Sequence, residues 1–199
     1  MSGTVPFVGL TGGMGAGKST ALSALRELGA DVISSDEVVH ELYEGPELVG
    51  ALSDRFGPEV APGGKVDRPE LARRAFASQE DRAWLEGLVW PLVGARIGAW
   101  LEHARSLQPP PRAAVVEVPL LFEAGLQEGY DATIAVVADE PLRRSRAAAR
   151  GQVLLEERDA RQLSQQEKAS RATFVVHNDG TEQDLARQLS EVLDKLDRR

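Results

Sequence analysis

The stretch FVGLTGGMGAGKST, from Phe7 to Thr20, decides the fold of this chain. Between Gly12 and Ser19 it holds the spacing Gly-x-x-x-x-Gly-Lys-Ser, which is the pattern of a phosphate-binding loop. An apolar run that suits a buried strand comes before the glycines, and a helical pattern begins at Lys18. The glycines let successive backbone N–H groups converge on a phosphate without side chains in the way. We therefore expect a strand, a phosphate-binding turn and a helix, with a nucleoside triphosphate as the ligand.

Two side chains at the end of the loop have roles of their own in this pattern. Lys18 can reach the β- and γ-phosphates, and the hydroxyl of Ser19 can ligate Mg²⁺. A plain glycine-rich turn between a strand and a helix would need neither residue. On these grounds the candidate nucleotide-binding residues are Gly12, Gly13, Gly15, Gly17, Lys18 and Ser19.

The composition excludes several classes of function. The 199 residues, 42% of them hydrophobic, suffice for one well-packed domain. A formal net charge of −8 argues against a nucleic-acid or anionic-membrane surface, because both need a basic face. The absence of cysteine excludes disulfides, cysteine nucleophiles and thiolate metal sites. The N-terminus does not resemble a signal peptide, and no window approaches the roughly 20 apolar residues of a membrane span. We expect a cytoplasmic protein.

The strands that we expect form an α/β fold. A strand at 5–10, a helix at 18–28 that Gly29 ends, and an apolar run at Val32 and Ile33 make a βαβ unit, which favours a parallel sheet. Further strands are expected at 113–118, 132–138 and 174–176, and a final amphipathic helix at 182–196. The near-continuous apolar runs suit a sheet that is covered on both faces.

Between Asp36 and about Pro111 we expect helices and no strand. Pro91 should kink the last of these helices or force a restart, and we expect the tryptophans to be core residues. Two more helices, rich in charge, should follow the fourth strand. The helices expected here are 37–43, 47–56, 69–76, 81–107, 141–150 and 156–168.

Asp36 is the first candidate for chemistry beyond the phosphate loop. It lies at the carboxyl end of the second expected strand, and ligands of open parallel sheets gather at that end of the strands. A carboxylate there could accept a proton from an attacking hydroxyl, as the base of a phosphoryl transfer does. The alternative is that Asp36 caps the next helix, since Asp is favoured at that position.

Two further segments have a functional and a structural interpretation. The arginine cluster around Arg146 and Arg150 could surround a transferring phosphoryl group, or could be a solvated charged face. The run Val118–Glu123 directly follows a strand and is unusually apolar for a loop. It could pack a substrate beside the sheet edge, although a buried turn is the simpler interpretation.

The motifs LTGGMGAGKST, VISSDEVVHEL, VDRPELARRAFA, VPLLFEAGL, the arginine helix and FVVHNDGT occur in this order along the chain. As an ordered set they resemble the dephospho-CoA kinase family. The resemblance implies a three-layer P-loop kinase fold around a five-stranded parallel sheet, and transfer of the ATP γ-phosphate to the ribose 3′-hydroxyl of dephospho-CoA. It also implies a core (1–35, 112–139 and 168–199), a helical CoA-binding insertion (36–111) and a lid (140–167).

The resemblance also implies roles for individual residues. The ATP-binding stretch would run from Gly15 to Thr20 and so include Ala16. Asp36 would be the base, and Arg146 and Arg150 would be lid arginines. The acceptor would lie near Arg68, Pro119, Leu120, Leu121 and Glu123. The adenine of ATP would lie near Asn178 and Gly180.

Three departures from the family pattern affect these details: Ser34, Trp90 and Thr173 stand where the family usually has Asp, His and Asp. The role of Glu117 in a metal shell stays open. Two rival functions also remain. One is a kinase for another small molecule, such as a nucleotide or a sugar acid. The other is a nucleotide-dependent switch, but the guanine-reading pattern Asn-Lys-x-Asp does not occur in the sequence. We expect no obligate protein partner.

Overall fold

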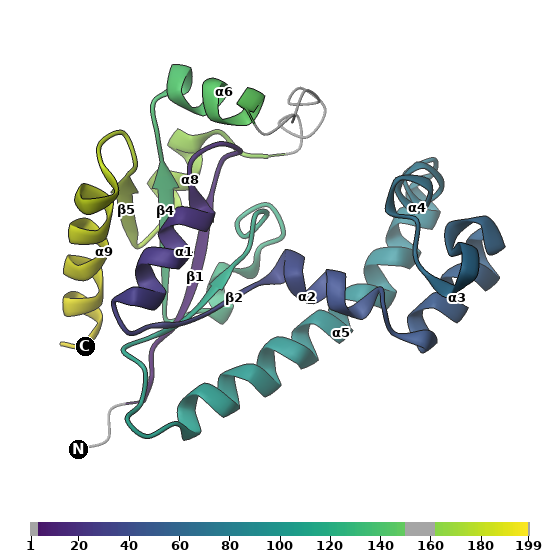
Figure 1. Cartoon of the computed structure of the whole chain (residues 1–199), viewed down its shortest axis with the longest axis horizontal. Coiled ribbons are helices and arrows are strands. Elements are labelled where there is room, and N and C mark those ends of the chain that lie inside the picture. The colour runs from purple at the N-terminus through teal and green to yellow at the C-terminus, as the bar shows by residue number, and fades with distance from the viewer. Residues whose placement is uncertain (1–3, 150–161, 199) are drawn as a thin grey trace. The chain divides into compact units, whose positions relative to one another are not determined.

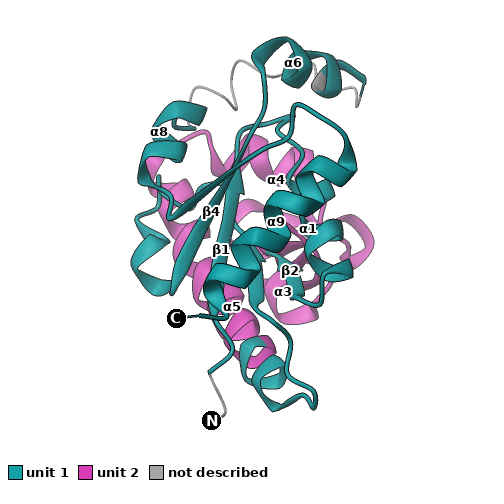
Figure 2. Cartoon of the chain, turned by 90° about the vertical axis from the view of Figure 1, so that its left-hand side faces the viewer, with its two compact units in different colours: residues 1–34, 101–199 teal, residues 35–100 magenta. Residues whose placement is uncertain are grey.

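The structure is a computed structural model that describes residues 4–149 and 162–198. It divides into two compact units (Figure 2), one formed by residues 1–34 and 101–199 and the other by residues 35–100. Each unit has a hydrophobic cluster of its own. No helix in the described part of the chain combines the length and the apolar character that crossing a membrane requires.

The first unit is built on a parallel sheet of five strands in the order β2-β3-β1-β4-β5 (Figure 1). The strands are β1 (Phe7–Gly12), β2 (Asp31–Ser34), β3 (Ala114–Glu117), β4 (Ala132–Val137) and β5 (Phe174–His177). The expected five-stranded α/β sheet is confirmed. Because the strands are parallel, the polar or glycine residues at their carboxyl ends meet at one edge. There, Glu117 pairs in register with both Leu10 and Ser34.

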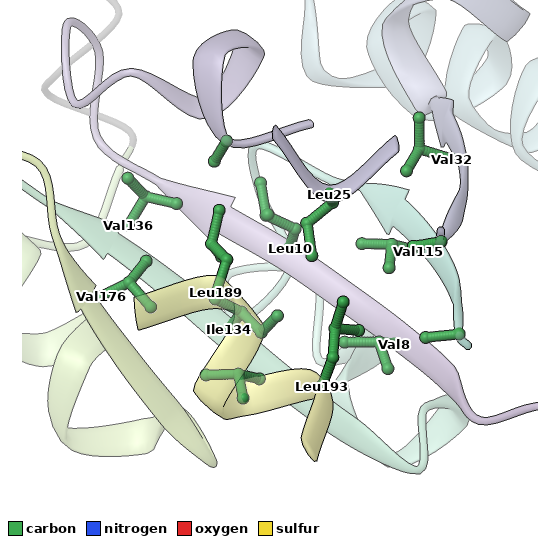
Figure 3. Close-up of a cluster of buried hydrophobic side chains, with 14 of the residues drawn as sticks. Val8, Leu10, Leu25, Val32, Val115, Ile134, Val136, Val176, Leu189 and Leu193 are labelled. Atoms are coloured by element: carbon green, nitrogen blue, oxygen red, sulfur yellow. The ribbon is translucent and has the colours of Figure 1, made fainter. Parts of the chain in front are cut away.

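Helices cover both faces of this sheet. The α-helices that lie wholly within the described residues of the first unit are α1 (Lys18–Glu27), α6 (Glu140–Ala149), α8 (Gln165–Arg171) and α9 (Glu182–Leu196). Helices α1 and α9 contact each other, and their leucines pack on Val8 and Leu10 (Figure 3). Side chains alternate along a strand, so Thr11 faces the opposite side, where Lys168 of α8 reaches it. The result is a three-layer arrangement.

Local signals set the ends of these helices. Gly29 follows α1 with a φ of 92°, and the N–H of Ala30 reaches back to the carbonyl of Leu25. This is the left-handed cap for which glycine is favoured. Helix α9 begins with a capping box, in which Thr181 and Asp184 satisfy each other's backbone N–H groups.

The second unit is helical in the structure, as the sequence pattern indicates. Its helices are α2 (Ser35–Leu42), α3 (Pro46–Phe56), α4 (Arg68–Ala75) and most of α5 (Gln79–Ser106), with short 3-10 turns at η1 (Pro58–Val60) and η2 (Pro62–Gly64). Leu52, Phe56 and Leu71 are buried in its core. Trp84 packs edge-on against Phe56, with ring centroids 5.5 Å apart.

One expectation about the helices is narrowed, and two need correction. Helix α5 passes through Pro91 as one element, so the expected restart does not occur there, and the alternative, a kink, stays a prediction. Trp90 is 56% exposed and is not a core residue, because α5 carries apolar side chains around its circumference and only some of them face the core. The helix expected at 156–168 begins at Gln165 in the described residues, where Ser164 caps it, and its first part lies outside them.

Candidate active site

The phosphate-binding loop connects the end of β1 at Gly12 to the start of α1 at Lys18. Gly15 and Gly17 have φ values of 73° and 93°, in the left-handed region that favours glycine. A Cβ atom at Gly12 would lie 2.5 Å from the carbonyl oxygen of Val136. Gly17 is the N-cap residue and supplies no side-chain cap to α1. The start of this helix therefore presents backbone donors and the positive end of its dipole, which suit an anion.

Lys18 lies across the loop that precedes it. Its ammonium donates to the carbonyl oxygens of Gly12 at 3.1 Å and Gly13 at 3.4 Å. The same ammonium lies 4.0 Å from the carboxylate of Glu117, and both side chains are largely buried. A phosphate oxygen would compete with these carbonyl oxygens for the ammonium, and the binding of phosphate by Lys18 stays a prediction.

Glu117 lies close to Lys18, and the sequence analysis left its role open. It ends the otherwise apolar strand β3 and faces Lys18 at the carboxyl edge of the sheet. A carboxylate at the end of an apolar strand is costly to bury without a partner. The position of Glu117 in the sequence therefore indicated that a cation lies nearby. Ser19 lies exposed in the first turn of α1, and Thr20 follows it, half-buried.

Two residues from outside the loop hold its backbone in place. The guanidinium of Arg143, in α6, donates to the carbonyl of Met14 at 2.9 Å. Asn178, which follows β5 and is buried, donates from its side-chain amide to the carbonyl of Ala16 at 2.9 Å. A Cβ atom at Gly17 would lie 1.9 Å from that same amide nitrogen. The loop is therefore shaped from both sides by groups that leave no room for other side chains.

Arg146 completes this cluster. Its guanidinium donates to the backbone carbonyl of Asn178 at 3.0 Å, so α6 brings a second arginine to the loop. Both Arg143 and Arg144 pair with Glu140. The hydrogen bond from Arg144 and the two nearby positive charges lower the pKa of Glu140, which stays ionised at neutral pH. The predicted lid residue Arg150 lies outside the described residues.

The predicted acceptor loop has exposed and buried parts. Leu120 is 40% exposed, whereas Leu121 is fully buried and packs near Gly9 in β1. Glu123 forms an ion pair with Lys168, with an N–O distance of 2.9 Å. The segment Pro119–Glu123 is a turn in which Leu121 is buried, as the simpler interpretation of the sequence expects. Its contact with a substrate stays a prediction.

Asp36 and Arg68 belong to the second unit. Asp36 lies in the first turn of α2, and this helix begins at Ser35, directly after β2 ends at Ser34. Asp36 is thus inside the helix and is not its N-cap residue. Its side chain is exposed. Arg68 is the first residue of α4, half-buried, and Asp67 caps that helix.

Two remaining features bear on ligands. Gly180 precedes α9, and a Cβ atom there would lie 2.9 Å from a carboxylate oxygen of Asp184. In the described part of the chain, no group of three or more His, Cys, Asp or Glu side chains could hold a metal ion. The hard oxygen donors beside Lys18, the hydroxyl of Ser19 and the carboxylate of Glu117, nevertheless fit Mg²⁺, which takes few protein ligands when substrate phosphates supply others.

A family model described as dephospho-CoA kinase matches residues 6–184. The chain belongs to the dephospho-CoA kinase family. Among curated members, the dephospho-CoA kinase of Deinococcus radiodurans is 42% identical over 193 residues, covering 96% of this chain and 92% of its own length. The dephospho-CoA kinase of Rhizobium meliloti is 37% identical over 193 residues, covering 96% and 97%.

Solved structures share the fold of this chain. A crystal structure of TT1252 from Thermus thermophilus superposes with a TM-score of 0.80 at 34% identity, covering 97% of this chain and 98% of that chain. A dephospho-CoA kinase from Campylobacter jejuni has a TM-score of 0.65 at 24% identity, covering 98% of both chains, and a shikimate kinase from Acinetobacter baumannii has one of 0.53 at 16% identity, covering 96% and 94%. These last two share the fold. The predicted P-loop kinase fold and kinase class are confirmed, and a nucleotide-dependent switch is not favoured.

Proposed function

We propose that this protein transfers the γ-phosphate of ATP to the ribose 3′-hydroxyl of dephospho-CoA and gives CoA and ADP. Family membership carries the proposal, and the glycine loop held between Arg143 and Asn178 supports it. A cytoplasmic location fits this small-molecule chemistry. Residues 36–111 would bind the acceptor and residues 140–167 would act as the lid.

The phosphate loop would bind the triphosphate. Backbone N–H groups between Gly12 and Thr20, with the ammonium of Lys18, would hold its oxygens in a fixed geometry. Catalysis of phosphoryl transfer depends mainly on such positioning and on electrostatic stabilisation. Mg²⁺, when bound, would neutralise phosphate charge. Ser19 would be a ligand of the ion, and Glu117 is a second candidate ligand. Asn178 and Gly180 would lie near the adenine.

Asp36 would act as the general base. It follows the last residue of β2 by two positions, and that residue, Ser34, pairs in register with Glu117 at the carboxyl edge of the sheet. The side chain of Asp36 is exposed in the first turn of α2. It could therefore orient the 3′-hydroxyl and accept its proton as the phosphoryl group arrives.

Cations would stabilise the charge that the transfer spreads over the phosphoryl oxygens. Arg146 already lies beside the loop through its bond to Asn178, and Arg150, which follows it in the sequence, would act with it. On the acceptor side, Arg68, Pro119 and Leu120 would contact dephospho-CoA. Leu121, which is buried, and Glu123, which is ion-paired, belong to the same loop and would support the residues that contact dephospho-CoA.

A coupled ADP-release assay tests the proposal. Purified protein is supplied with ATP and Mg²⁺ and with dephospho-CoA, AMP, shikimate, gluconate or no acceptor. We expect ADP release that depends on dephospho-CoA, together with CoA as the product in mass spectrometry. If another acceptor stimulates ADP release and dephospho-CoA does not, the protein is a kinase for that other small molecule. ADP release that no acceptor stimulates would contradict the proposal.

A further inference from the structure

Lys168 in α8 is the only fully buried charged side chain among the residues that the structure describes. Its ammonium donates to three acceptors from different segments. These are the carbonyl of Pro119 at 2.6 Å, a carboxylate oxygen of Glu123 at 2.9 Å and the hydroxyl of Thr11 at 3.4 Å. Thr11 in turn donates to the carbonyl of Pro119 at 3.2 Å. All three N–H donors of the ammonium therefore have an acceptor.

Lys168 joins two segments, the start of the phosphate loop and the predicted acceptor loop. The proposed reaction needs these two segments in a fixed relative position. Thr11 directly precedes Gly12, where the phosphate loop begins. Pro119 directly precedes Leu120, the exposed residue of the predicted acceptor loop. Lys168 thus bonds on one side to the strand that carries the phosphate loop and on the other to both ends of Pro119–Glu123.

Hydrogen bonds fix the position of helix α8, which carries Lys168. The side-chain amide of Gln165, one turn earlier, donates to the carbonyl of Ala138 at 2.9 Å and accepts from the N–H of Ala138 at 3.0 Å. Glu123 is also tied to the start of this helix, because its Oε1 atom accepts from the N–H of Leu163 at 2.7 Å. The helix, the end of β4 and the acceptor loop therefore form one hydrogen-bonded unit.

Stability alone gives no reason for this arrangement. Desolvating an ammonium and a carboxylate offsets most of their attraction, and apolar side chains of the same volume often stabilise a core equally well. What an apolar residue cannot do is bond to the carbonyl of Pro119 and the hydroxyl of Thr11. The distinctive effect of Lys168 is therefore on the geometry of those two backbone segments.

We propose that Lys168 is a positioning residue, which with Glu123 sets the acceptor loop Pro119–Glu123 at a fixed distance from the phosphate loop. The inference rests on the proposed function for the identity of the acceptor. Lys168 touches neither substrate. It acts through the backbone of Pro119, and its loss should impair use of the acceptor and leave ATP binding in place.

The experiment compares Lys168→Met, the double variant Lys168→Met with Glu123→Gln, and the control Lys195→Met, which removes an exposed lysine from α9. Lys168→Met alone leaves a buried carboxylate without its cation and should lower the urea midpoint of unfolding. The double variant removes both charges and keeps an amide oxygen for the N–H of Leu163. It should recover most of that loss.

In both Lys168 variants we expect kcat/KM for dephospho-CoA to fall about tenfold, the effect of one lost charge-assisted hydrogen bond. The Kd for an unreactive ATP analogue should stay within about twofold of the wild-type value, and Lys195→Met should match the wild type. A double variant with wild-type stability and wild-type kcat/KM for the acceptor would overturn the proposal. An equal loss of affinity for the ATP analogue would also overturn it.

Hydrogen–deuterium exchange separates this inference from the proposed reaction. In the double variant, amides of residues 119–126 should exchange faster than in the wild type, while those of β4 should not. Unchanged exchange in residues 119–126 would overturn the positioning role whatever the acceptor is. Wild-type protein that does not phosphorylate dephospho-CoA would instead reject the proposed reaction, and the exchange result would still decide the role of Lys168.

Discussion

At the scale of single residues, Asn178 forms hydrogen bonds with three separate segments around the phosphate loop. Its backbone N–H donates to the carbonyl of Val137, its side chain donates to Ala16 and its carbonyl accepts from Arg146. One buried residue thus connects the end of β4, the phosphate loop and α6. The glycine at position 17 is part of this connection, because the amide nitrogen of Asn178 occupies the space of a Cβ atom there.

Gly17→Ala should therefore weaken ATP binding by at least about tenfold, since it displaces a buried hydrogen-bonded amide. Gly29→Ala is the matched control. Its φ of 92° is nearly the same as that of Gly17, but a Cβ atom there would be 3.7 Å from its nearest neighbour. We expect Gly29→Ala to lose about 1 kcal/mol of stability from backbone strain and to keep ATP affinity. Calorimetric titration with ATP would measure the affinity of each variant for ATP. Equal affinities in the two variants would contradict the prediction.

Arg143 and Arg144 make a second matched pair. Both bond to Glu140, and Arg143 in addition donates to the carbonyl of Met14 in the phosphate loop. Arg143→Gln should raise the Kd for ATP about tenfold, whereas Arg144→Gln should change it less than about twofold. Each variant removes one positive charge from the same helix. If both weaken binding equally, the effect is one of net charge and the contact with the loop is unimportant.

Asp36→Asn should lower kcat by about 10²–10⁴-fold, which is the usual effect of losing a general base. ATP affinity should stay within about twofold, because the phosphate loop supplies that binding. The control is Glu37→Gln, which neutralises the neighbouring exposed carboxylate in the same helical turn. Single-turnover kinetics with dephospho-CoA would give both rates. Near-normal turnover in Asp36→Asn would reject this residue as the base.

At the scale of elements, α4 shows how much of a helix is determined locally. Asp67 caps it by accepting from the N–H of Glu70 at 3.0 Å. Glu70 accepts hydrogen bonds from Arg73 and Arg74 one turn later, which lower its pKa to about 2. Arg74 also donates to the carbonyl of Phe56, so the ion pairs of α4 extend to the end of α3. An ionised Glu70 therefore contributes to the stability of this unit, within the small range of exposed ion pairs.

The sign of the resulting pH dependence follows from the direction of the shift. A carboxyl whose pKa is lowered in the folded state stabilises it above about pH 4.5, and this stabilisation is lost as the pH falls toward 2. Glu70→Gln should have a lower urea midpoint than the wild type at pH 7. The difference should shrink between pH 5 and pH 3. Urea unfolding at several pH values would test this, and a difference that does not vary with pH would contradict it.

At the scale of the whole molecule, the described residues form two hydrophobic clusters that share no residue. One lies between the sheet and helices α1 and α9 (Figure 3), and the other lies among the helices of residues 35–100. Separate cores can open with separate free energies. This arrangement allows one cluster to lose structure while the other remains folded.

Leu52→Ala and Leu189→Ala test this independence, because each removes a fully buried leucine from one cluster. Each should cost about 2–5 kcal/mol locally. By hydrogen–deuterium exchange, Leu52→Ala should increase exchange in α3 and α4 more than in β1 and β4, and Leu189→Ala should do the reverse. Equal increases in both units for either variant would show a single cooperative core.

The features that could be predicted from the sequence are those that nearby residues determine. The phosphate loop, the strands around it and α9 were all recoverable, because periodicity, glycines and caps act within one or two turns of chain. The family resemblance rested on the same short motifs. The position of Lys18 at the loop follows from its spacing alone.

Tertiary structure decided which distant residues became partners. The pattern of charges in α6 does not distinguish Arg143, which reaches the loop, from Arg144, which does not. Nothing local marks Lys168 as buried, or Trp90 as exposed. Burial and long-range hydrogen bonds depend on which faces pack after the helices form, and side-chain type sets only a preference. The sequence by itself thus determined the phosphate loop and its sheet, and the packing of α6, α8 and the chain after β5 decided what holds that loop in place.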